Sequence, residues 1–254
     1  MRSTEWDKIA DHYFEKIDSP FSSGAKNKIY RLIKKVKNPN KKKVLEIGCG
    51  TGTLVPFLAK NFRKVIATDI SKKMVELAHE KAIRYPNVLV KKIDSIQIHR
   101  LRQKFDVIIS INSMLMPNIV KVNQIMRKCH KLLKKNGVFI GVFPSMDSLI
   151  YHKLIMYDKE YDKRHNRRKA RLATGRILAT RTYDLVYGYF DDQGKQKHYY
   201  GVELDYRFRK AGFSRIKVGK LTYPWETVEY DPNPKRFLDD IYDELWDWTV
   251  YAEK

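Results

Sequence analysis

The segment VLEIGCGTG at residues 44–52 limits the possible folds of this chain more than any other feature. It begins with a short apolar run that contains one acid, Glu46, and continues with three glycines at alternate positions. The run predicts a buried strand, and glycine allows the backbone to turn sharply and to approach a ligand closely. A helix that starts after such a loop points free amides toward it, so we expect a strand–loop–helix unit that binds a ligand at the loop.

The rest of the chain alternates between strand and helix patterns, which predicts a mostly parallel sheet with helices on both faces. Further strands are expected at 64–68, 87–92, 105–110, 138–143, 214–223 and 246–254. Helices are expected at 53–60, 71–83 (capped by Ser71), 118–137 (ended by Gly137) and 202–213 (ended by Gly212). Two insertions interrupt this order. One is a basic helix followed by a β-hairpin around DDQG, within 144–199, and the other is 223–244.

The composition excludes several classes of protein. With 43% hydrophobic and 31% charged residues among 254, the chain has the composition of a globular protein. No segment approaches the roughly 18 apolar residues of a membrane helix, and the charged N-terminal segment does not resemble a signal peptide. The two cysteines, Cys49 and Cys129, are too few for a disulfide framework, and the scattered histidines predict no metal site. We therefore expect a cytoplasmic protein with no membrane span.

The net charge is extreme, with 51 Lys and Arg against 29 Asp and Glu, formally +22. It indicates either an anionic partner, such as nucleic acid, or a surface coated with lysine, and we favour the lysine coat. Residues 159–181 hold nine basic and two acidic side chains, whereas 226–247 hold eight acidic and two basic ones. The basic segment either binds an anion or has a structural role, as a solvated helix or as a helix that pairs with the acidic segment. The structural role is favoured, because no aromatic residues alternate with the arginines.

The glycine spacing distinguishes among nucleotide-binding loops. A dinucleotide loop follows G-x-G-x-x-G, but position 53 is Thr, and the Gly-Lys-Ser/Thr of a phosphate-binding loop is absent. Asp69 ends the next strand about 20 residues further on, where an acid accepts hydrogen bonds from ribose hydroxyls. A nucleoside with a carboxylate tail fits this loop best.

These residues resemble the class I S-adenosylmethionine-dependent methyltransferases, a seven-strand, Rossmann-like family. Glu46 and the three loop glycines match its first motif, E-x-G-x-G-x-G, and ATDIS at 67–71 matches its second. The resemblance covers about residues 43–143 and 200–254. It implies a three-layer α/β fold with a mostly parallel seven-stranded sheet, an antiparallel last strand and lid insertions.

The resemblance also implies which residues hold S-adenosylmethionine. Asp69 is expected at the ribose hydroxyls, Asp94 at the adenine amino group, and 110–112 beside the methionine and methyl end. The full set of expected cofactor-binding residues is Glu46, Gly48, Cys49, Gly50, Gly52, Asp69, Ile70, Asp94, Ser95, Ser110 and Asn112. Cys49 is not expected to act as a nucleophile, because no histidine neighbours it in the sequence.

The same resemblance suggests how the chain is divided. We expect an N-terminal helical lid segment at 1–42, a cofactor-binding half at 43–143, a substrate lid at 144–199, and a C-terminal half at 200–254. Candidate substrate-lid residues are the aromatics Tyr13, Tyr151, Tyr223 and Trp225. No residue is assigned as a catalytic base.

The favoured function is transfer of a methyl group from S-adenosylmethionine to a small-molecule or lipid-precursor acceptor, because a core with such a lid is typical of these relatives. One alternative is a tRNA or other nucleic-acid methyltransferase, which the charge suggests. Another is a non-catalytic S-adenosylmethionine-binding protein. The Asn-Pro-Pro-Tyr signature of relatives that methylate amino nitrogens is replaced by SINSM at 110–114, which counts against a base amino group as acceptor. The sequence specifies neither the acceptor atom nor the oligomeric state.

Overall fold

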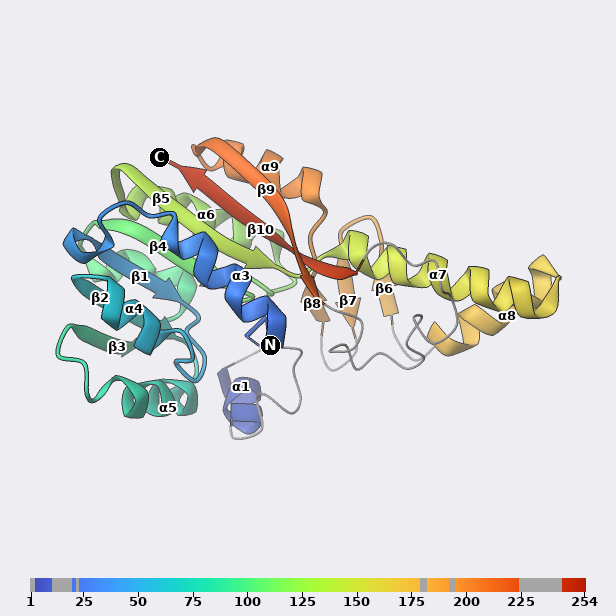
Figure 1. Cartoon of the computed structure of the whole chain (residues 1–254), viewed down its shortest axis with the longest axis horizontal. Coiled ribbons are helices and arrows are strands. Elements are labelled where there is room, and N and C mark those ends of the chain that lie inside the picture. The colour runs from blue at the N-terminus through green and yellow to red at the C-terminus, as the bar shows by residue number, and fades with distance from the viewer. Residues whose placement is uncertain (1–2, 11–19, 22, 179–181, 192–194, 224–243) are drawn as a thin grey trace.

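The computed structural model describes residues 3–10, 20–21, 23–178, 182–191, 195–223 and 244–254 (Figure 1). Two of the expected lid residues, Tyr13 and Trp225, lie outside this part of the chain, as does most of the acidic segment. In the described residues no helix is long and apolar enough to cross a membrane.

A seven-stranded sheet forms the centre of the molecule, with the order β3-β2-β1-β4-β5-β10-β9 (Figure 1). Its strands are β1 (Lys43–Ile47), β2 (Lys64–Asp69), β3 (Val88–Lys92), β4 (Phe105–Ile111), β5 (Leu133–Phe143), β9 (Ser214–Tyr223) and β10 (Leu245–Glu253). Strands β1 to β5 pair in parallel, and the last strand, β10, runs antiparallel to both of its neighbours. This confirms the expected fold class.

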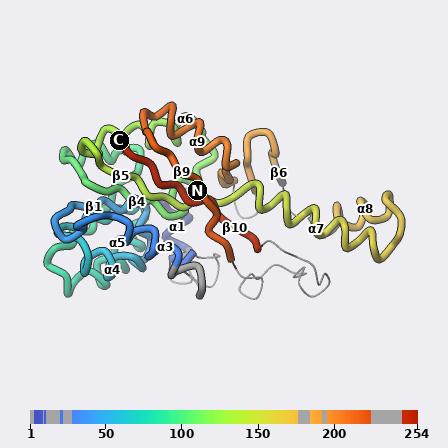
Figure 2. The backbone as a smooth tube through the Cα atoms, turned by 45° about the horizontal axis from the view of Figure 1, so that its top comes forward, coloured from blue at the N-terminus to red at the C-terminus, as the bar shows by residue number. Residues whose placement is uncertain are grey.

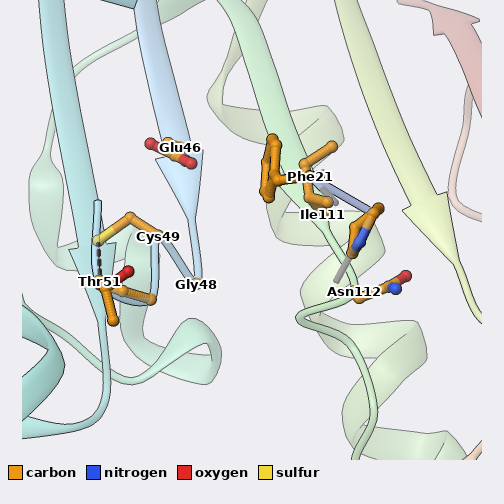
Figure 3. Close-up of a pocket in the computed structure, with 9 residues that line it drawn as sticks. Phe21, Glu46, Gly48, Cys49, Thr51, Ile111 and Asn112 are labelled. Atoms are coloured by element: carbon orange, nitrogen blue, oxygen red, sulfur yellow. Dashed lines mark hydrogen bonds between the residues drawn. The ribbon is translucent and has the colours of Figure 1, made fainter. Parts of the chain in front are cut away.

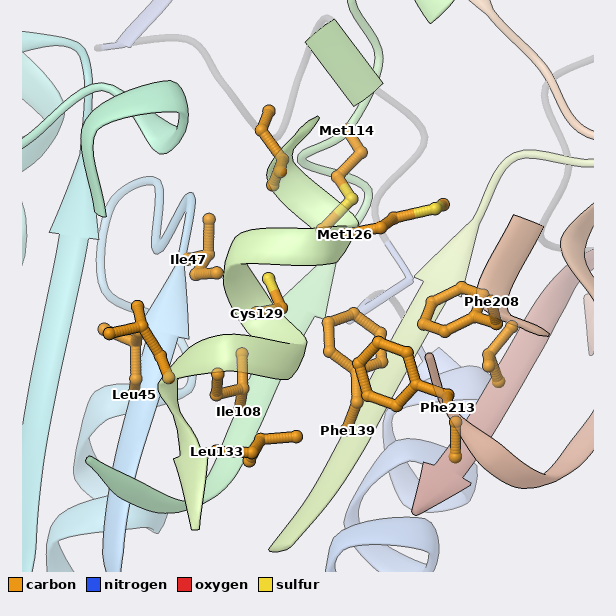
Figure 4. Close-up of a cluster of buried hydrophobic side chains, with 14 of the residues drawn as sticks. Leu45, Ile47, Ile108, Met114, Met126, Cys129, Leu133, Phe139, Phe208 and Phe213 are labelled. Atoms are coloured by element: carbon orange, nitrogen blue, oxygen red, sulfur yellow. The ribbon is translucent and has the colours of Figure 1, made fainter. Parts of the chain in front are cut away.

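Helices cover both faces of the sheet and give the molecule three layers. They are α3 (Ser23–Lys34), α4 (Val55–Asn61), α5 (Lys72–Ala82), α6 (Ile119–Leu132) and α9 (Gly201–Lys210), and α1 (Ser3–Ile9) packs against α5. Successive strand residues point to opposite faces, so Val44 packs in the cluster that contains α3 and α4. Leu45 packs in the cluster that contains α6 and α9, which Figure 4 shows.

The boundary between α6 and β5 differs from the expectation. The helix ends at Leu132, and Gly137 lies inside β5 and does not end the helix. Leu133 is fully buried and pairs with Phe105 of β4, so the strand begins four residues before the glycine. Sheet pairing therefore prevails over the helix pattern of the lysine-rich stretch.

The expected insertion contains more structure than one helix and one hairpin. Helices α7 (Met146–Arg164) and α8 (Arg167–Leu178) pack together and extend away from the sheet in both views (Figures 1 and 2). A separate three-stranded sheet follows, made of β6 (Thr182–Asp184), β7 (Tyr189–Asp191) and β8 (Lys195–Lys197). Strands β7 and β8 are the expected hairpin, whereas the expected first strand is divided into β6 and β7 by a turn.

Candidate functional site

A pocket opens where β1 and β4 end, at the carboxyl edge of the parallel strands (Figure 3). Open α/β sheets bind their ligands at this edge. The pocket is lined by Pro20, Phe21, Glu46, Gly48, Cys49, Gly50, Thr51, Ile111 and Asn112. Five of the eleven residues expected to bind cofactor therefore line one cavity: Glu46, Gly48, Cys49, Gly50 and Asn112.

The glycine loop is packed closely against its neighbours at two positions. A side chain at Gly48 would collide with Ser113, which follows β4, and one at Gly52 would lie 2.8 Å from Cα of Ala78 in α5. Both glycines also have a positive φ, 66° and 77°, which other residues adopt with strain. Gly48 thus lets the loop approach the end of β4, and Gly52 lets α5 approach the loop.

Asp69 joins the loop to the next strand. One carboxylate oxygen accepts from the amide of Gly50 and the other from the amide of Ser71, each at 2.9 Å. Burial raises the pKa of Asp69, and these backbone hydrogen bonds oppose the shift. A carboxylate offers about four acceptor positions, so Asp69 retains capacity for two ligand hydroxyls.

The N-terminal helix α1 reaches the same place. Asp7 accepts from the hydroxyl of Ser71 at 2.5 Å and from the amide of Lys73 at 3.1 Å, and the Ser71 bond lowers the pKa of Asp7. Ser71 is the N-cap of α5, as expected from the sequence, and bonds the amide of Met74. Asp7 was not identified in the sequence, because a single acid in a charged helix carries no distinguishing signal.

Glu46 is the most unusual side chain in the pocket. It is 3% exposed, and its Oε2 atom has no hydrogen-bond partner within the described part of the chain. Burial, and then the nearby charge of Asp69, raise the pKa of Glu46 to about 8. A buried acceptor without a partner is costly unless a ligand supplies the donor.

Asn112 stands across the pocket from Glu46, just after β4, with a φ of 43° (Figure 3). Its side-chain nitrogen donates to Asp247 of β10 at 2.9 Å, and Tyr223 of β9 donates to the same carboxylate oxygen at 2.7 Å. Its side-chain oxygen is buried and, among the described residues, has no partner. Asp247 was missed in the sequence, because nothing in a terminal strand indicates that it reaches the end of β4.

The remaining expected residues have local roles around the pocket. Asp94 caps the short helix η3 (Ser95–Leu101) by accepting from the amide of Ile96. Ser110 is fully buried and shares a 2.7 Å hydrogen bond with Ser113. The residues that do not line this pocket are Gly52, Asp69, Ile70, Asp94, Ser95 and Ser110.

Two other expectations concern Cys49 and the lid. Burial raises the pKa of the Cys49 thiol well above its usual value, so the thiol stays protonated. Tyr151 of α7 packs against Trp246 of β10, with ring centroids 5.6 Å apart, and does not line the pocket. Tyr223 is not among the lining residues, but its hydroxyl donates to Asp247, which also accepts from Asn112. The lining residues Pro20, Phe21 and Thr51 were not singled out in the sequence, whereas Ile111 falls within the expected range 110–112.

The pocket contains hydrogen-bond acceptors and a glycine loop that a ligand can approach closely, rather than a set of metal ligands. Within the described ranges no three His, Cys, Asp or Glu side chains gather as a metal site. The two buried acceptor atoms, on Glu46 and Asn112, match a ligand that donates hydrogen bonds, and the ammonium group of an amino acid is such a donor. The site therefore fits a nucleoside that carries an amino-acid tail.

Comparison with known proteins supports this interpretation. Residues 44–137 match the model of a family described as "Methyltransferase domain". A ubiquinone biosynthesis O-methyltransferase of Pelagibacter ubique is 32% identical over 96 residues, which are 38% of this chain and 39% of that protein. A malonyl-[acyl-carrier protein] O-methyltransferase of Priestia megaterium is 32% identical over 118 residues, 43% and 41% of the two chains. This chain thus spans about two fifths of the length of these curated relatives.

Shorter and more distant similarities extend the comparison. Three matches of 58 residues are to ribosomal RNA and tRNA methyltransferases. The crystal structure of magnesium protoporphyrin IX methyltransferase from Synechocystis, with bound S-adenosylmethionine, superposes with a TM-score of 0.60 at 14% identity. That alignment covers 99% of this chain and 94% of the other, so the similarity in fold extends over nearly the whole chain.

Proposed function

We propose that this chain, a member of the class I S-adenosylmethionine-dependent methyltransferases, transfers the methyl group of that cofactor to a small-molecule acceptor. Membership rests on the family match of residues 44–137 and on the seven-stranded sheet with its antiparallel last strand. The observation that carries the proposed activity is the pocket itself, where the glycine loop, Glu46 and Asn112 meet at the carboxyl edge of the sheet.

Each part of the pocket has a task in this proposal. When bound, the cofactor supplies an electrophilic methyl group, so the protein chiefly binds, orients and excludes water. Asp69 holds the ribose hydroxyls, and the amide-rich loop around Gly50 faces the carboxylate end. Glu46 and Asn112 supply acceptors for the ammonium group, and we assign Asp94 and Ser95 to the adenine.

The acceptor is proposed from relatives and from the insertion. Two of the curated relatives are, by name, an O-methyltransferase of ubiquinone biosynthesis and a malonyl-[acyl-carrier protein] O-methyltransferase. Helices α7 and α8 and the small sheet follow β5 and lie beyond the same edge of the core as the pocket (Figure 1). We assign to them the role of a substrate lid.

A nucleic-acid acceptor is the second candidate, because of one structural observation. The α7–α8 pair extends from the body and exposes Lys163, Arg164, Arg167, Arg168, Lys169 and Arg171. Such a projecting basic pair can follow a phosphate backbone. It ranks second because residues 163–171, which hold these exposed basic side chains, contain no Phe, Tyr or Trp for base stacking, and the preceding Tyr157 and Tyr161 stack on each other.

Cofactor titration tests the proposal. By isothermal titration calorimetry, we expect the wild type to bind S-adenosylmethionine and not NAD. Asp69→Ala should weaken binding about 30- to 1,000-fold, because two charge-assisted hydrogen bonds to the ribose are lost. Asp205→Ala, which removes an exposed carboxylate on α9, is the matched control and should bind as the wild type does. Binding of NAD alone would exclude the assignment.

Transfer of a labelled methyl group identifies the acceptor class. The enzyme is incubated with labelled cofactor and with separate pools of total RNA, lipids and small metabolites. Label in the metabolite or lipid pool supports the proposal, and label in one RNA species supports the second candidate. Tight cofactor binding with no transfer to any pool would indicate the non-catalytic alternative.

A further inference from the structure

The side chain of Asn112 is held from outside the cofactor-binding half of the chain. Its nitrogen donates to Oδ2 of Asp247 at 2.9 Å, and the Tyr223 hydroxyl donates to the same atom at 2.7 Å. Asp247 lies near the start of β10, and Tyr223 is the last residue of β9. Three strands that are distant in sequence therefore meet at one carboxylate oxygen.

This contact fixes the orientation of the side-chain amide of Asn112, a residue that lines the pocket. An ionised carboxylate only accepts hydrogen bonds, so the amide must turn its NH₂ group toward Asp247. Its oxygen is then directed away from Asp247 and is buried, with no partner in the described residues. Glu46 lines the same pocket, and its Oε2 atom is likewise buried with no hydrogen-bond partner in the described residues.

We propose that Asp247 is a positioning residue that orients the Asn112 amide so that its oxygen, together with Glu46, recognises the ammonium group of the cofactor. This inference rests on the proposed function. It adds to that function a residue from the last strand, which acts on cofactor binding through Asn112.

The chemistry of the ligand follows from the two acceptors. A neutral hydroxyl has one proton to donate, whereas an ammonium group has three and can bond two acceptors at once. Such charge-assisted bonds are about twice as strong as neutral ones. Without Asp247, the Asn112 amide is free to turn its NH₂ group toward the ligand. Two hydrogen-bond donors, this NH₂ group and the ligand's ammonium group, then face each other.

The test compares two ligands that differ only in the ammonium group. S-adenosylhomocysteine and its deaminated analogue, in which hydrogen replaces the amino group, are titrated into each variant by calorimetry. We expect the wild type to prefer S-adenosylhomocysteine by about 100-fold. In Asp247→Ala, affinity for S-adenosylhomocysteine should fall about tenfold, while affinity for the analogue stays within about threefold.

Two further variants separate orientation from charge and from fold damage. Asp247→Asn loses the charge but keeps an oxygen that can accept from both Asn112 and Tyr223, so the preference should stay within about threefold of the wild type. Asn112→Ala should reduce the preference by about tenfold, leaving the part due to Glu46, and adding Asp247→Ala to it should change nothing more. Asp205→Ala on α9 again serves as the surface control.

Several outcomes would overturn the inference. Equal weakening of both ligands in Asp247→Ala would indicate a structural role only. If Asp247→Asn lost the preference as much as Asp247→Ala does, the effect would be one of charge. If Asp247→Ala still lowered the preference in the Asn112→Ala background, Asp247 would act by a route other than Asn112. If the wild type binds neither S-adenosylmethionine nor S-adenosylhomocysteine, the proposed function itself fails.

Discussion

At the scale of single residues, Glu46 lowers the stability of the folded protein and, in our proposal, contributes to cofactor binding. Its carboxyl group is buried, and its pKa is raised to about 8. A raised pKa in the folded state means that the native protein holds the proton more tightly than the unfolded chain does. The protonated carboxyl is therefore tolerated at low pH, and stability is lost as the pH rises from about 4.5 toward 8.

Glu46→Gln, which cannot ionise, should remove this loss. We expect the ligand-free variant to be more stable than the wild type at pH 8.5 by roughly 1–3 kcal/mol, and the difference to vanish near pH 4. The same variant should bind S-adenosylmethionine at least about tenfold more weakly, because the amide cannot offer a charged acceptor. Thermal melts across this pH range, with calorimetry, measure both effects. A lower melting temperature at pH 8.5 would contradict the account.

Sequence patterns identified the residues of the loop but not those that reach it from elsewhere. The acid and glycines of 44–52 stand together in one motif, and Asp69 follows the next strand, so order along the chain is sufficient to find them. Asp247 and Phe21 reach the site from distant segments. Their proximity depends on strand order and on the path of the N-terminal segment, which local patterns do not encode.

The buried lysine of β8 shows, at the scale of elements, how the insertion is fastened to the core. Lys197 is 1% exposed, and its ammonium group donates to Glu203 of α9 at 2.7 Å and to the carbonyls of Tyr187 and His198. All three of its donors are used. The small sheet is therefore joined to α9 by one fully bonded cation.

Lys197→Met, which keeps the volume but removes the donors, should destabilise the protein by about 2–4 kcal/mol. The cost is limited because Arg207 still pairs with Glu203 at 2.7 Å. Lys195→Met, an exposed position in the same strand, is the matched control and should change stability by less than about 0.5 kcal/mol. Urea unfolding measures both variants. Equal effects of the two substitutions would indicate that the buried contacts contribute nothing.

Most core elements were predictable, because their apolar periodicity agrees with their tertiary partners. The predicted end of α6 was wrong, because it depends on the pairing of Leu133 with Phe105. These residues are 28 positions apart, so a local pattern does not reveal their contact. The turn between β6 and β7 was missed for a similar reason. The second half of the insertion is rich in tyrosine throughout, so its sequence contains no clear break between the two strands.

At the scale of the whole molecule, the positive net charge raises the question whether the protein binds RNA specifically. This can be tested at the basic helices α7 and α8. A site that grips a phosphate backbone releases counterions, so the logarithm of its affinity falls linearly with the logarithm of salt concentration. If RNA binds here, replacing Arg167 and Arg168 with alanine should lower that slope by about 2. We expect weak binding with no preference for RNA over heparin, and little change in the slope. Titrations of the wild type and of this variant at several salt concentrations decide between the two.

The junction at Asp247 has a consequence for how two ligands of this protein influence each other. Residues 224–243 connect Tyr223, the last residue of β9, to β10, which carries Asp247. If a molecule moved Tyr223 or Asp247 on binding, we would expect the orientation of Asn112, and with it the affinity for cofactor, to change. Thermodynamic linkage makes this influence mutual: the cofactor changes the affinity for that molecule by the same factor. One carboxylate oxygen is thus enough to link the affinities of the protein for two ligands.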